Sequence, residues 1–554
     1  MLLTQKITAA IAKIIRDPDF TVEFSGSFEH GDYSSNVALV LAKKKGKNPK
    51  EYAQELVETL QKSADLADFV ARIEVAGPGF INFWLREEFL KKNLDTIIKD
   101  KDVYGASDLG KGKTMVIDYS SPNIAKSFGI GHLRSTIIGQ ALYNLYQFLG
   151  YKTIGDNHLG DWGTQFGKLL YMIDKEGGSP EISLDWLEKK YVEFHRLAQE
   201  DESLEEHARE WFKKLEDKDS QARALWQKCV EVSLSEFNRI YDLLGVKIDY
   251  AYGESFYEDL MLEVIAEAKE KGLAKESQGA WVVEAPGSKT PLMLVKKDGA
   301  TTYAARDLAA LKFRQKQWHP DLIIYEVGVE QSLHFSQVFT VARRLGYVGP
   351  ETELVHTKHG LYTDGRGRKL STRKGENVKL EEILREAIER AEKLGSSDEE
   401  TAEQVGIGAV KYFDLKHTPQ SNIIFDWGKM FELEGNSGPY LQYTVARALS
   451  VLRKATEGKK KESSGDDDFY PEELSVMRTL TRFHEIIVAA AKTYSPSVLC
   501  EYLFDLAQKF NTFYNKHKVI GSESEEFRLI LCSATAQVLE NGLKILGIAT
   551  PQKM

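Results

Sequence analysis

Cysteine is scarce in this sequence. Only Cys229, Cys500 and Cys532 occur among the 554 residues, and no two of them form a Cys-x-x-Cys pair. Because a thiolate zinc site of the usual kind needs such closely spaced pairs, the sequence excludes one, and we expect no structural metal. The low number of cysteines also favours a reducing compartment, so we predict a cytoplasmic protein.

Long hydrophobic runs are missing too. No apolar stretch approaches the roughly 20 residues that a helix needs to cross a bilayer. Near the N-terminus, Leu3, Ile7 and Ile11 share one helical face, but Lys6 and Lys13 interrupt the segment. This pattern predicts an amphipathic helix rather than a signal peptide, and we expect no membrane partner.

The sequence has no excess of positive charge. Its 73 basic and 83 acidic residues give a net charge of −10, which argues against a protein that coats nucleic acid. An RNA partner is still compatible with this charge, because binding depends on local patches. Three basic patches occur, at 43–50, 366–374 and 453–461. For the first and third, a solvated loop is the simpler interpretation.

The order of patterns predicts a multidomain α/β protein. We expect an α+β domain over 1–107, a Rossmann-type parallel sheet over 108–425 and an all-α bundle over 426–554. A charged, glycine-poor stretch at about 184–250 predicts a helical insertion into the second domain, and the alternative that it is only a rigid spacer stays open. The strands predicted for the parallel sheet are 114–119, 151–156, 292–296, 322–327 and 353–359.

The stretch from Asp118 to Gly139 joins a buried strand to a helix through a turn. Two glycines, Gly129 and Gly131, come at the end of this turn, where the helix is expected to start. Such a turn gathers backbone amides and the positive end of a helix dipole, which favours a phosphate site. Lys126 and His132 add a charge and a donor beside it.

Three further segments contain residues that are suited to binding a nucleotide or another substrate. The loop 365–375 contains five basic residues and three glycines and can close over a triphosphate, or it is a basic surface loop. Gly328, Glu330 and Gln331 follow a buried strand, where open α/β sheets bind ligands. Tyr303 and Asp307 share one helical face and can hold a cationic substrate, or Asp307 complements a helix dipole.

Taken together, these motifs resemble those of class I aminoacyl-tRNA synthetases, and within that class of arginyl-tRNA synthetases. The similarity runs from end to end and includes an N-terminal segment with Gly79-Phe80-Ile81-Asn82-Phe83 and a helical C-terminal domain. It is carried by the segments 120–126, 158–163, 370–375 and 438–443. Two positions depart from the class motifs: Gly129 replaces the first histidine, and Thr372 replaces the second lysine of the loop. In the family, Lys126 is thought to stand in for that lysine.

The resemblance implies an arginine–tRNA ligase that uses ATP with Mg²⁺, L-arginine and tRNA(Arg), and we expect a monomer. It implies catalytic roles for Lys126, His132, Lys369 and Lys374. The implied arginine contacts are Asp118, Ser121, Asn123, Tyr303, Asp307 and Gln331. The implied ATP contacts are Gly129, Gly131, His132, Gly328, Glu330, Lys369 and Ser371.

For tRNA, the resemblance implies an anticodon-binding C-terminal domain. The implied tRNA contacts are Asn82 at the D-loop, and Tyr440, Tyr443 and Met554 in the C-terminal domain. Two alternatives stay open: an inactive paralogue that only binds tRNA, motivated by Gly129, and a class I synthetase of another amino-acid specificity.

Overall fold

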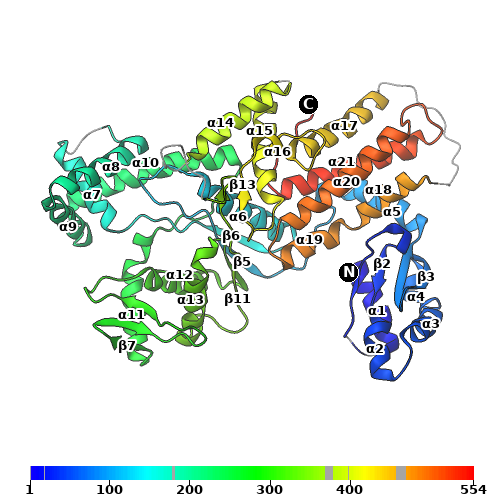
Figure 1. Ribbon diagram of the computed structural model, residues 1–554, viewed down its shortest axis with the longest axis horizontal. Helices are drawn as coiled ribbons and strands as arrows, with labels where there is room; N and C mark the ends of the chain where they lie inside the picture. The colour runs from blue at the N-terminus through cyan, green and yellow to red at the C-terminus, as the bar shows by residue number, and fades with distance from the viewer. Residues whose placement is uncertain are drawn as a thin grey trace.

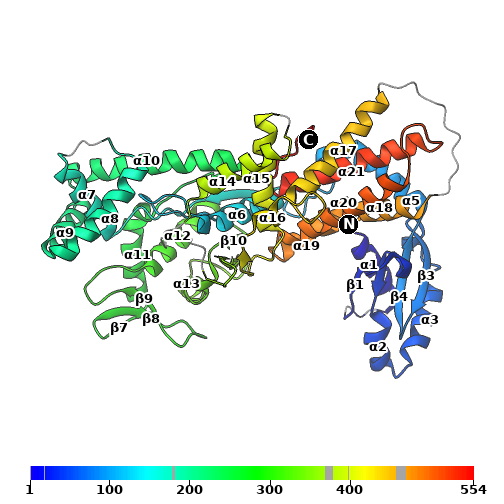
Figure 2. The same cartoon turned by 45° about the horizontal axis from the view of Figure 1, so that its top comes forward.

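The computed structural model describes residues 2–15, 17, 19–177, 181–368, 378–396, 398–456 and 469–554. The molecule is elongated around a small parallel sheet (Figures 1 and 2). A helical arm lies at one end, and the C-terminal helices lie at the other, with the N-terminal domain below them. The fold class predicted from the sequence is confirmed.

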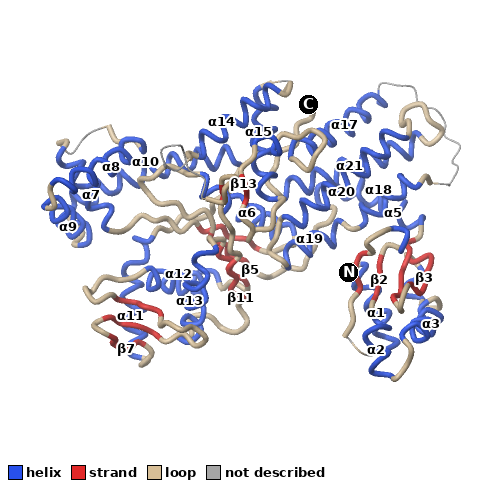
Figure 3. The backbone as a smooth tube through the Cα atoms, viewed as in Figure 1, coloured by secondary structure: helices blue, strands red, loops and turns tan. Residues whose placement is uncertain are grey.

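The central sheet has four parallel strands in the order β11-β10-β5-β6. It lies at the red segments near the labels β5 and β11 in Figure 3. Their bounds are β5 Thr114–Asp118, β6 Lys152–Asp156, β10 Leu322–Tyr325 and β11 Glu353–His356. The chain leaves β5 toward β6 on one side and later returns to β10 on the other. The crevice between the carboxyl ends of β5 and β10 is therefore the switch point where such sheets bind ligands.

Both faces of this sheet are buried, which explains the continuous apolar runs of its strands. Met115 and Ile117 pack into one core with α6 (Ile130–Phe148). Val116 and Ile323 pack into another, formed with α11, α12 and α13. These helices span Glu258–Glu270, Tyr303–Trp318 and Ser332–Leu345.

One predicted strand of the parallel sheet is wrong. The segment predicted at 292–296 is β9 (Leu292–Val295), which pairs antiparallel with β8 (Ala280–Val283) in a separate three-stranded sheet with β7 (Ala274–Ser277). A short apolar run reports burial but not its partner strand, so the pattern alone could not assign it to a sheet.

The predicted insertion forms the helical arm. It contains α8 (Leu184–Glu200), α9 (Ser203–Glu216) and α10 (Ser220–Leu244), which pack with α7 (Thr164–Lys175). Apolar residues at helical spacing, among them Phe194, Trp211 and Leu215, face inward and hold the helices together.

The N-terminal domain has an antiparallel sheet in the order β1-β2-β4-β3. Its elements are α1 Leu3–Ile15, β1 Val22–Phe24, β2 Tyr33–Ser35, α2 Val37–Lys45, α3 Pro49–Leu60, α4 Ala64–Ala67, β3 Val70–Ala76 and β4 Phe80–Leu85. The following α5 (Glu87–Asp100) packs against helices of the C-terminal bundle. Tyr33 and Thr4 donate hydrogen bonds to the buried Glu485, at 3.0 and 2.7 Å, and so fix the domain to that bundle.

The rest of the chain is mainly helical. Its elements are β12 Tyr362–Thr363, α14 Leu380–Lys393, α15 Glu399–Leu415, β13 Ile423–Ile424, α16 Trp427–Met430, α17 Gly438–Thr456, α18 Pro471–Thr481, α19 Phe483–Lys492, α20 Ser497–Lys516 and α21 Glu525–Ile545. Across the described ranges, no helix combines the length and apolar character that crossing a membrane requires. The three cysteines are buried and unpaired.

Candidate active site

A cavity of about 360 Å³ opens at the switch point between β5 and β10. It is lined by the turn after β5, the first turn of α6, the turn after β10 and the segment around His359. Eight predicted site residues meet there: Ser121, Asn123, Gly129, Gly131, His132, Gly328, Glu330 and Gln331. Residues about 200 positions apart in sequence thus line one cavity, because their strands β5 and β10 are adjacent.

The turn after β5 holds an unusual backbone. Ser120, Ser121 and Ala125 have φ of 74°, 47° and 63°, in the left-handed region that residues with a Cβ rarely adopt. Such conformations persist when surrounding contacts fix them, and they concentrate at functional sites. Here Ser135 Oγ accepts the Ser120 amide at 2.9 Å, and Asn157 Oδ1 accepts the Ser121 amide at 2.9 Å.

The position of Asn123 is fixed by two chain segments that approach each other closely. The Ile124 amide donates to Gly160 O and the Gly160 amide donates to Pro122 O, both at 3.1 Å. A Cβ on Gly160 would lie 2.2 Å from Asn123 Oδ1, so any larger residue at position 160 would displace the Asn123 side chain. The Gly160 loop therefore presents Asn123 at the edge of the cavity.

His132 lies in the first turn of α6, as predicted. Its Nδ1 accepts the Gly129 amide at 3.2 Å, which is the reciprocal half of a capping box. An accepting Nδ1 leaves the proton of a neutral imidazole on Nε2. Gly129, the position that departs from the class motif, is thus the N-cap of α6, and a Cβ on Gly131 would meet no protein atom within 4 Å.

Asp118 was predicted to contact arginine, but the structure uses its oxygens internally. Oδ2 pairs with the buried Arg314 at 2.7 Å, and Oδ1 accepts Ser121 Oγ at 2.9 Å. Arg314 also pairs with Asp156 at 2.8 Å, and burial raises the pKa of Asp156 although Arg314 opposes this shift. Asp118 does not line the cavity and acts on it through Ser121.

The opposite wall is built on Glu326, which is fully buried at the end of β10. Its carboxylate contacts His359 Nδ1 at 2.9 Å and accepts a hydrogen bond from Thr357 Oγ1. The Val329 amide donates to His359 O at 2.9 Å, so this pair fixes the Gly328–Gln331 turn. Sequence reasoning missed Glu326 and His359, although Glu326 directly precedes the predicted Gly328 turn.

Tyr303 and Asp307 lie outside this cavity, in the first turns of α12. Tyr303 is 69% exposed. Asp307 pairs with His334 of α13, which begins directly after the Gly328–Gln331 turn. The predicted cation-binding pair therefore lies outside the cavity lining and is joined, through Asp307, to the helix that follows the Gly328–Gln331 turn.

A buried carboxyl that sequence reasoning missed, Glu254, lies near the same pair. It approaches Arg306 at 3.6 Å, and Asp307 and His158 are close enough to affect its ionisation. Burial raises the pKa of Glu254 to about 7, although Arg306 opposes the shift. No sequence motif marks this residue, because its neighbours come from three separate segments.

The basic loop predicted to bind ATP is only partly described. Lys369, Ser371 and Lys374 lie outside the described residues. Directly after the loop, the Ile130 amide donates to Val378 O and the Leu380 amide donates to Phe128 O. Residues 378–380, the first described residues after the loop, therefore pair with the turn that carries Gly129.

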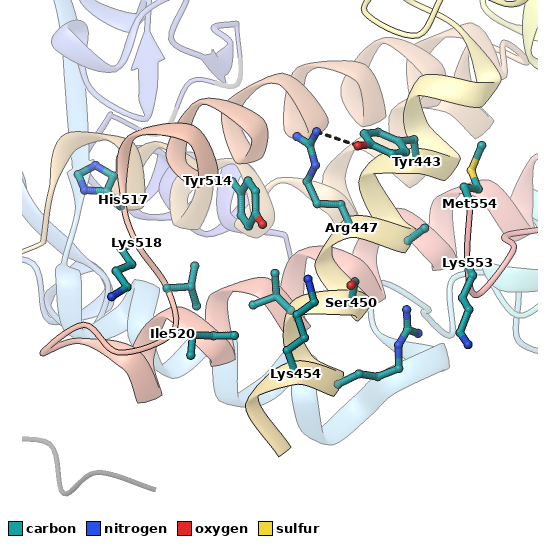
Figure 4. Close-up of a pocket in the computed structure, with 14 residues that line it drawn as sticks. Tyr443, Arg447, Ser450, Lys454, Tyr514, His517, Lys518, Ile520, Lys553 and Met554 are labelled. Carbon is teal, nitrogen blue, oxygen red and sulfur yellow. Dashed lines mark hydrogen bonds between the residues drawn. The ribbon is translucent and has the colours of Figure 1, made fainter. Parts of the chain in front are cut away.

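A second cavity, of about 1030 Å³, lies in the C-terminal bundle (Figure 4). The Arg447 guanidinium lies over the rings of Tyr443 and Tyr514, at 4.7 and 5.3 Å, and Met554 lies at the rim. The described lining contains no Asp or Glu; its basic residues are Arg447, Arg453, Lys454, His517, Lys518 and Lys553. This arrangement suits an anion that carries flat rings.

Two further predicted tRNA contacts are placed differently. Tyr440 is half-buried and its hydroxyl accepts Asn511 Nδ2 at 3.0 Å, beside but outside the lining of this cavity. Asn82 is 4% exposed, and its Oδ1 accepts Ser34 Oγ at 2.7 Å. Neither side chain is presented to solvent as openly as Tyr443.

Comparison with known families gives a consistent result over the whole chain. Residues 93–427 match the family model described as "tRNA synthetases class I (R), catalytic domain". Residues 441–554 match "DALR anticodon binding domain", and residues 1–85 match "Arginyl tRNA synthetase N terminal domain".

Individual proteins agree with these models. The chain is 40% identical to the arginine–tRNA ligase of Clostridium botulinum over 550 residues, which cover 96% of each chain. It is 42% identical to arginine–tRNA ligase 1 of Bacillus cereus, over 93% of this chain and 92% of that one. The crystal structure of arginyl-tRNA synthetase from Plasmodium falciparum superposes with a TM-score of 0.84 at 26% identity, covering 100% and 99% of the two chains.

Proposed function

This chain belongs to the arginyl-tRNA synthetase family of class I, and we propose on that premise that it is an arginine–tRNA ligase. The observation that carries the proposal is the cavity at the switch point, where Asn123, His132 and Gln331 converge from separate segments. A phosphate-binding helix end and amide side chains beside it suit joint binding of a nucleotide and an amino acid.

The reaction has two steps. In the first, an oxygen of the arginine carboxylate attacks the α-phosphorus of ATP; the bond to the bridging oxygen breaks, giving arginyl-adenylate and pyrophosphate. In the second, the 2′-hydroxyl of the terminal tRNA adenosine attacks the arginyl carbonyl, loses its proton, and AMP leaves. Such transfers depend mainly on positioning and charge stabilisation, and Mg²⁺ enters with ATP to neutralise its phosphates.

For ATP, we assign binding to the two glycine turns and the basic loop. Gly129, Gly131 and Gly328 let the nucleotide approach the backbone, while Glu330 and Ser371 offer hydrogen bonds. His132 donates through Nε2 to the phosphates at the positive end of α6. Charge that develops on pyrophosphate is stabilised by Lys126, Lys369 and Lys374.

For arginine, we assign the α-amino and carboxylate groups to Ser121, Asn123 and Gln331, with Asp118 acting through Ser121. Tyr303 and Asp307 bind the guanidinium, whose planar donors match a carboxylate. Glu254 adds a second carboxylate near this end. Lysine would leave these acceptors incompletely paired, which supports a discrimination of about 10⁴-fold.

For tRNA, we assign the anticodon to the second cavity, in the C-terminal bundle, with Tyr443, Arg447 and Met554 as contacts. Tyr440, beside this cavity, supports them. We assign the D-loop to the strand surface around Asn82. Stacking between aromatic rings and a guanidinium is a common way to bind single-stranded bases. We further propose that the enzyme works as a monomer in the cytoplasm, in keeping with its three unpaired thiols.

A charging assay tests the proposal. The protein, ATP, Mg²⁺ and tRNA are incubated with labelled arginine, lysine or glutamine in parallel, and ATP–pyrophosphate exchange is followed with and without tRNA. We expect charging with arginine only. Charging with another amino acid would overturn the assigned pocket, and no arginine-dependent turnover with tRNA present would overturn the enzyme.

A further inference from the structure

The helical arm contacts the strained turn at several points. Ser233 of α10 accepts the Ala125 amide at 3.0 Å, and Tyr241 of α10 shares a hydrogen bond with Ser120 Oγ at 2.8 Å. Glu188 of α8 accepts the Ser127 amide at 2.6 Å. A simple spacer needs none of these contacts, because its hydrogen bonds would stay within the arm.

Lys126 is flanked by two of these anchored amides, those of Ala125 and Ser127. Its ammonium group lies 5.7 Å from the centre of the Tyr191 ring, also on α8. Glu188 and Tyr191 are three residues apart and therefore share one face of the helix. One face of α8 thus contacts both the side chain of Lys126 and the backbone next to it.

The same face contacts Lys379, which lies four residues after the basic loop and caps α14. Asp185, three residues before Glu188, pairs with Lys379 at 2.7 Å, and Glu188 Oε2 lies 3.7 Å from the same ammonium group. Lys379 is in the segment that pairs with Phe128 and Ile130 of the turn. We call Asp185, Glu188 and Tyr191 the α8 clasp.

We propose that the α8 clasp positions Lys126 for the reaction on ATP, so that the insertion is part of the catalytic apparatus. The left-handed φ of Ala125 is an energetically unfavourable backbone conformation. If the amides of residues 125 and 127 lost their hydrogen bonds to the arm, the turn could relax out of this conformation. Glu188 acts as a positioning residue: it binds the backbone that orients Lys126. The proposal rests on the proposed function, since it needs ATP to be the substrate.

Single variants at Glu188 test its part. Glu188→Ala removes the acceptor, whereas Glu188→Gln keeps an oxygen for the Ser127 amide. We expect Glu188→Ala to lower kcat of ATP–pyrophosphate exchange about tenfold, with KM for arginine within about twofold of wild type and most activity retained by Glu188→Gln. Glu193→Ala is the matched control, because Glu193 lies on the same helix but pairs with Lys190.

A double-mutant cycle shows whether the effect passes through Lys126. In a Lys126→Ala background we expect Glu188→Ala to cause little further loss. Equal losses in both backgrounds, or a Glu188→Ala variant that matches Glu193→Ala, would overturn the proposal. Thermal unfolding of all variants identifies any loss that comes from unfolding. Failure of the wild-type protein to charge tRNA with arginine would instead contradict the proposed function.

Discussion

His132 accepts a hydrogen bond from the backbone amide of Gly129 at 3.2 Å, so the histidine both caps α6 and lines the cavity. We assign separate roles to the two ring nitrogens: Nδ1 accepts the amide at the helix start, and Nε2 is the nitrogen that we propose donates to a phosphate. The class motif has a histidine at position 129, but in this chain that position supplies an amide instead.

This division predicts that two His132 variants differ in stability but not in activity. His132→Asn keeps an oxygen near Nδ1, whereas His132→Ala loses both functions. We expect both to lower kcat of exchange about 100-fold, and only the alanine variant to lose about 1 kcal/mol of unfolding free energy. Exchange kinetics and thermal unfolding measure the two effects; an active His132→Asn enzyme would contradict the role of Nε2.

Asp307→Asn should affect arginine far more than ATP. Losing the charge removes a charge-assisted bond to the guanidinium, and we expect kcat/KM for arginine to fall about 100-fold or more while KM for ATP stays within about twofold. Steady-state exchange with each substrate varied measures this. His334→Ala is the control, since it leaves the carboxylate but removes its partner. Equal losses for both substrates would argue against the guanidinium role.

The raised pKa of Glu254 predicts a pH dependence of arginine binding. Its carboxyl ionises as the pH rises through about 7, and the ionised form attracts a guanidinium. We expect KM for arginine to fall from pH 6 to pH 8 in the wild type and to vary less in Glu254→Gln. A variant that keeps the full wild-type pH profile would show that another group titrates.

The raised pKa of Glu254 also makes the stability of the folded protein depend on pH. Because the folded pKa lies above the ordinary value of 4.5, its contribution is fully present below that value and is lost as the pH rises through about 7. The melting temperature of Glu254→Gln relative to wild type should therefore increase from pH 5 to pH 8. A constant difference between the two proteins would refute this linkage.

Arg314 neutralises two carboxylates, Asp118 and Asp156, in the protein interior. Arg314→Met leaves both without their cation, and we expect a loss of about 3–5 kcal/mol in unfolding free energy. Chemical denaturation measures this loss, and Arg385→Met, at an exposed arginine of α14, serves as the comparison. Similar midpoints for the two variants would be inconsistent with a buried ion triad.

Arg447→Ala should weaken tRNA binding without altering the active site. The Arg447 guanidinium lies over two tyrosine rings in the second cavity, whose described lining has no acidic residues. Loss of the guanidinium should therefore raise Kd for tRNA about tenfold. Filter binding at fixed salt measures this, with Lys492→Ala on α19 as the control. An unchanged Kd would exclude Arg447 from the tRNA contact.

Local sequence was enough to predict much of this molecule. The apolar run at Met115–Ile117 and the helical spacing after His132 each act within a few residues, so the strand, the turn and the helix follow from the chain itself. Gly328, Glu330 and Gln331 could be named because ligands bind at a predictable edge of an open α/β sheet, whereas Ser121 and Asn123 followed from the family resemblance.

Long-range contacts decided the rest. The sequence could not place Leu292–Val295 in its antiparallel sheet, nor show that Asp118 is held by Arg314, 196 residues away. It also left open whether the insertion is a spacer, because the bond from Ser127 to Glu188 joins residues 61 positions apart. Periodicity and motifs record only what neighbours along the chain do, whereas these contacts exist only after the helices and strands have packed together.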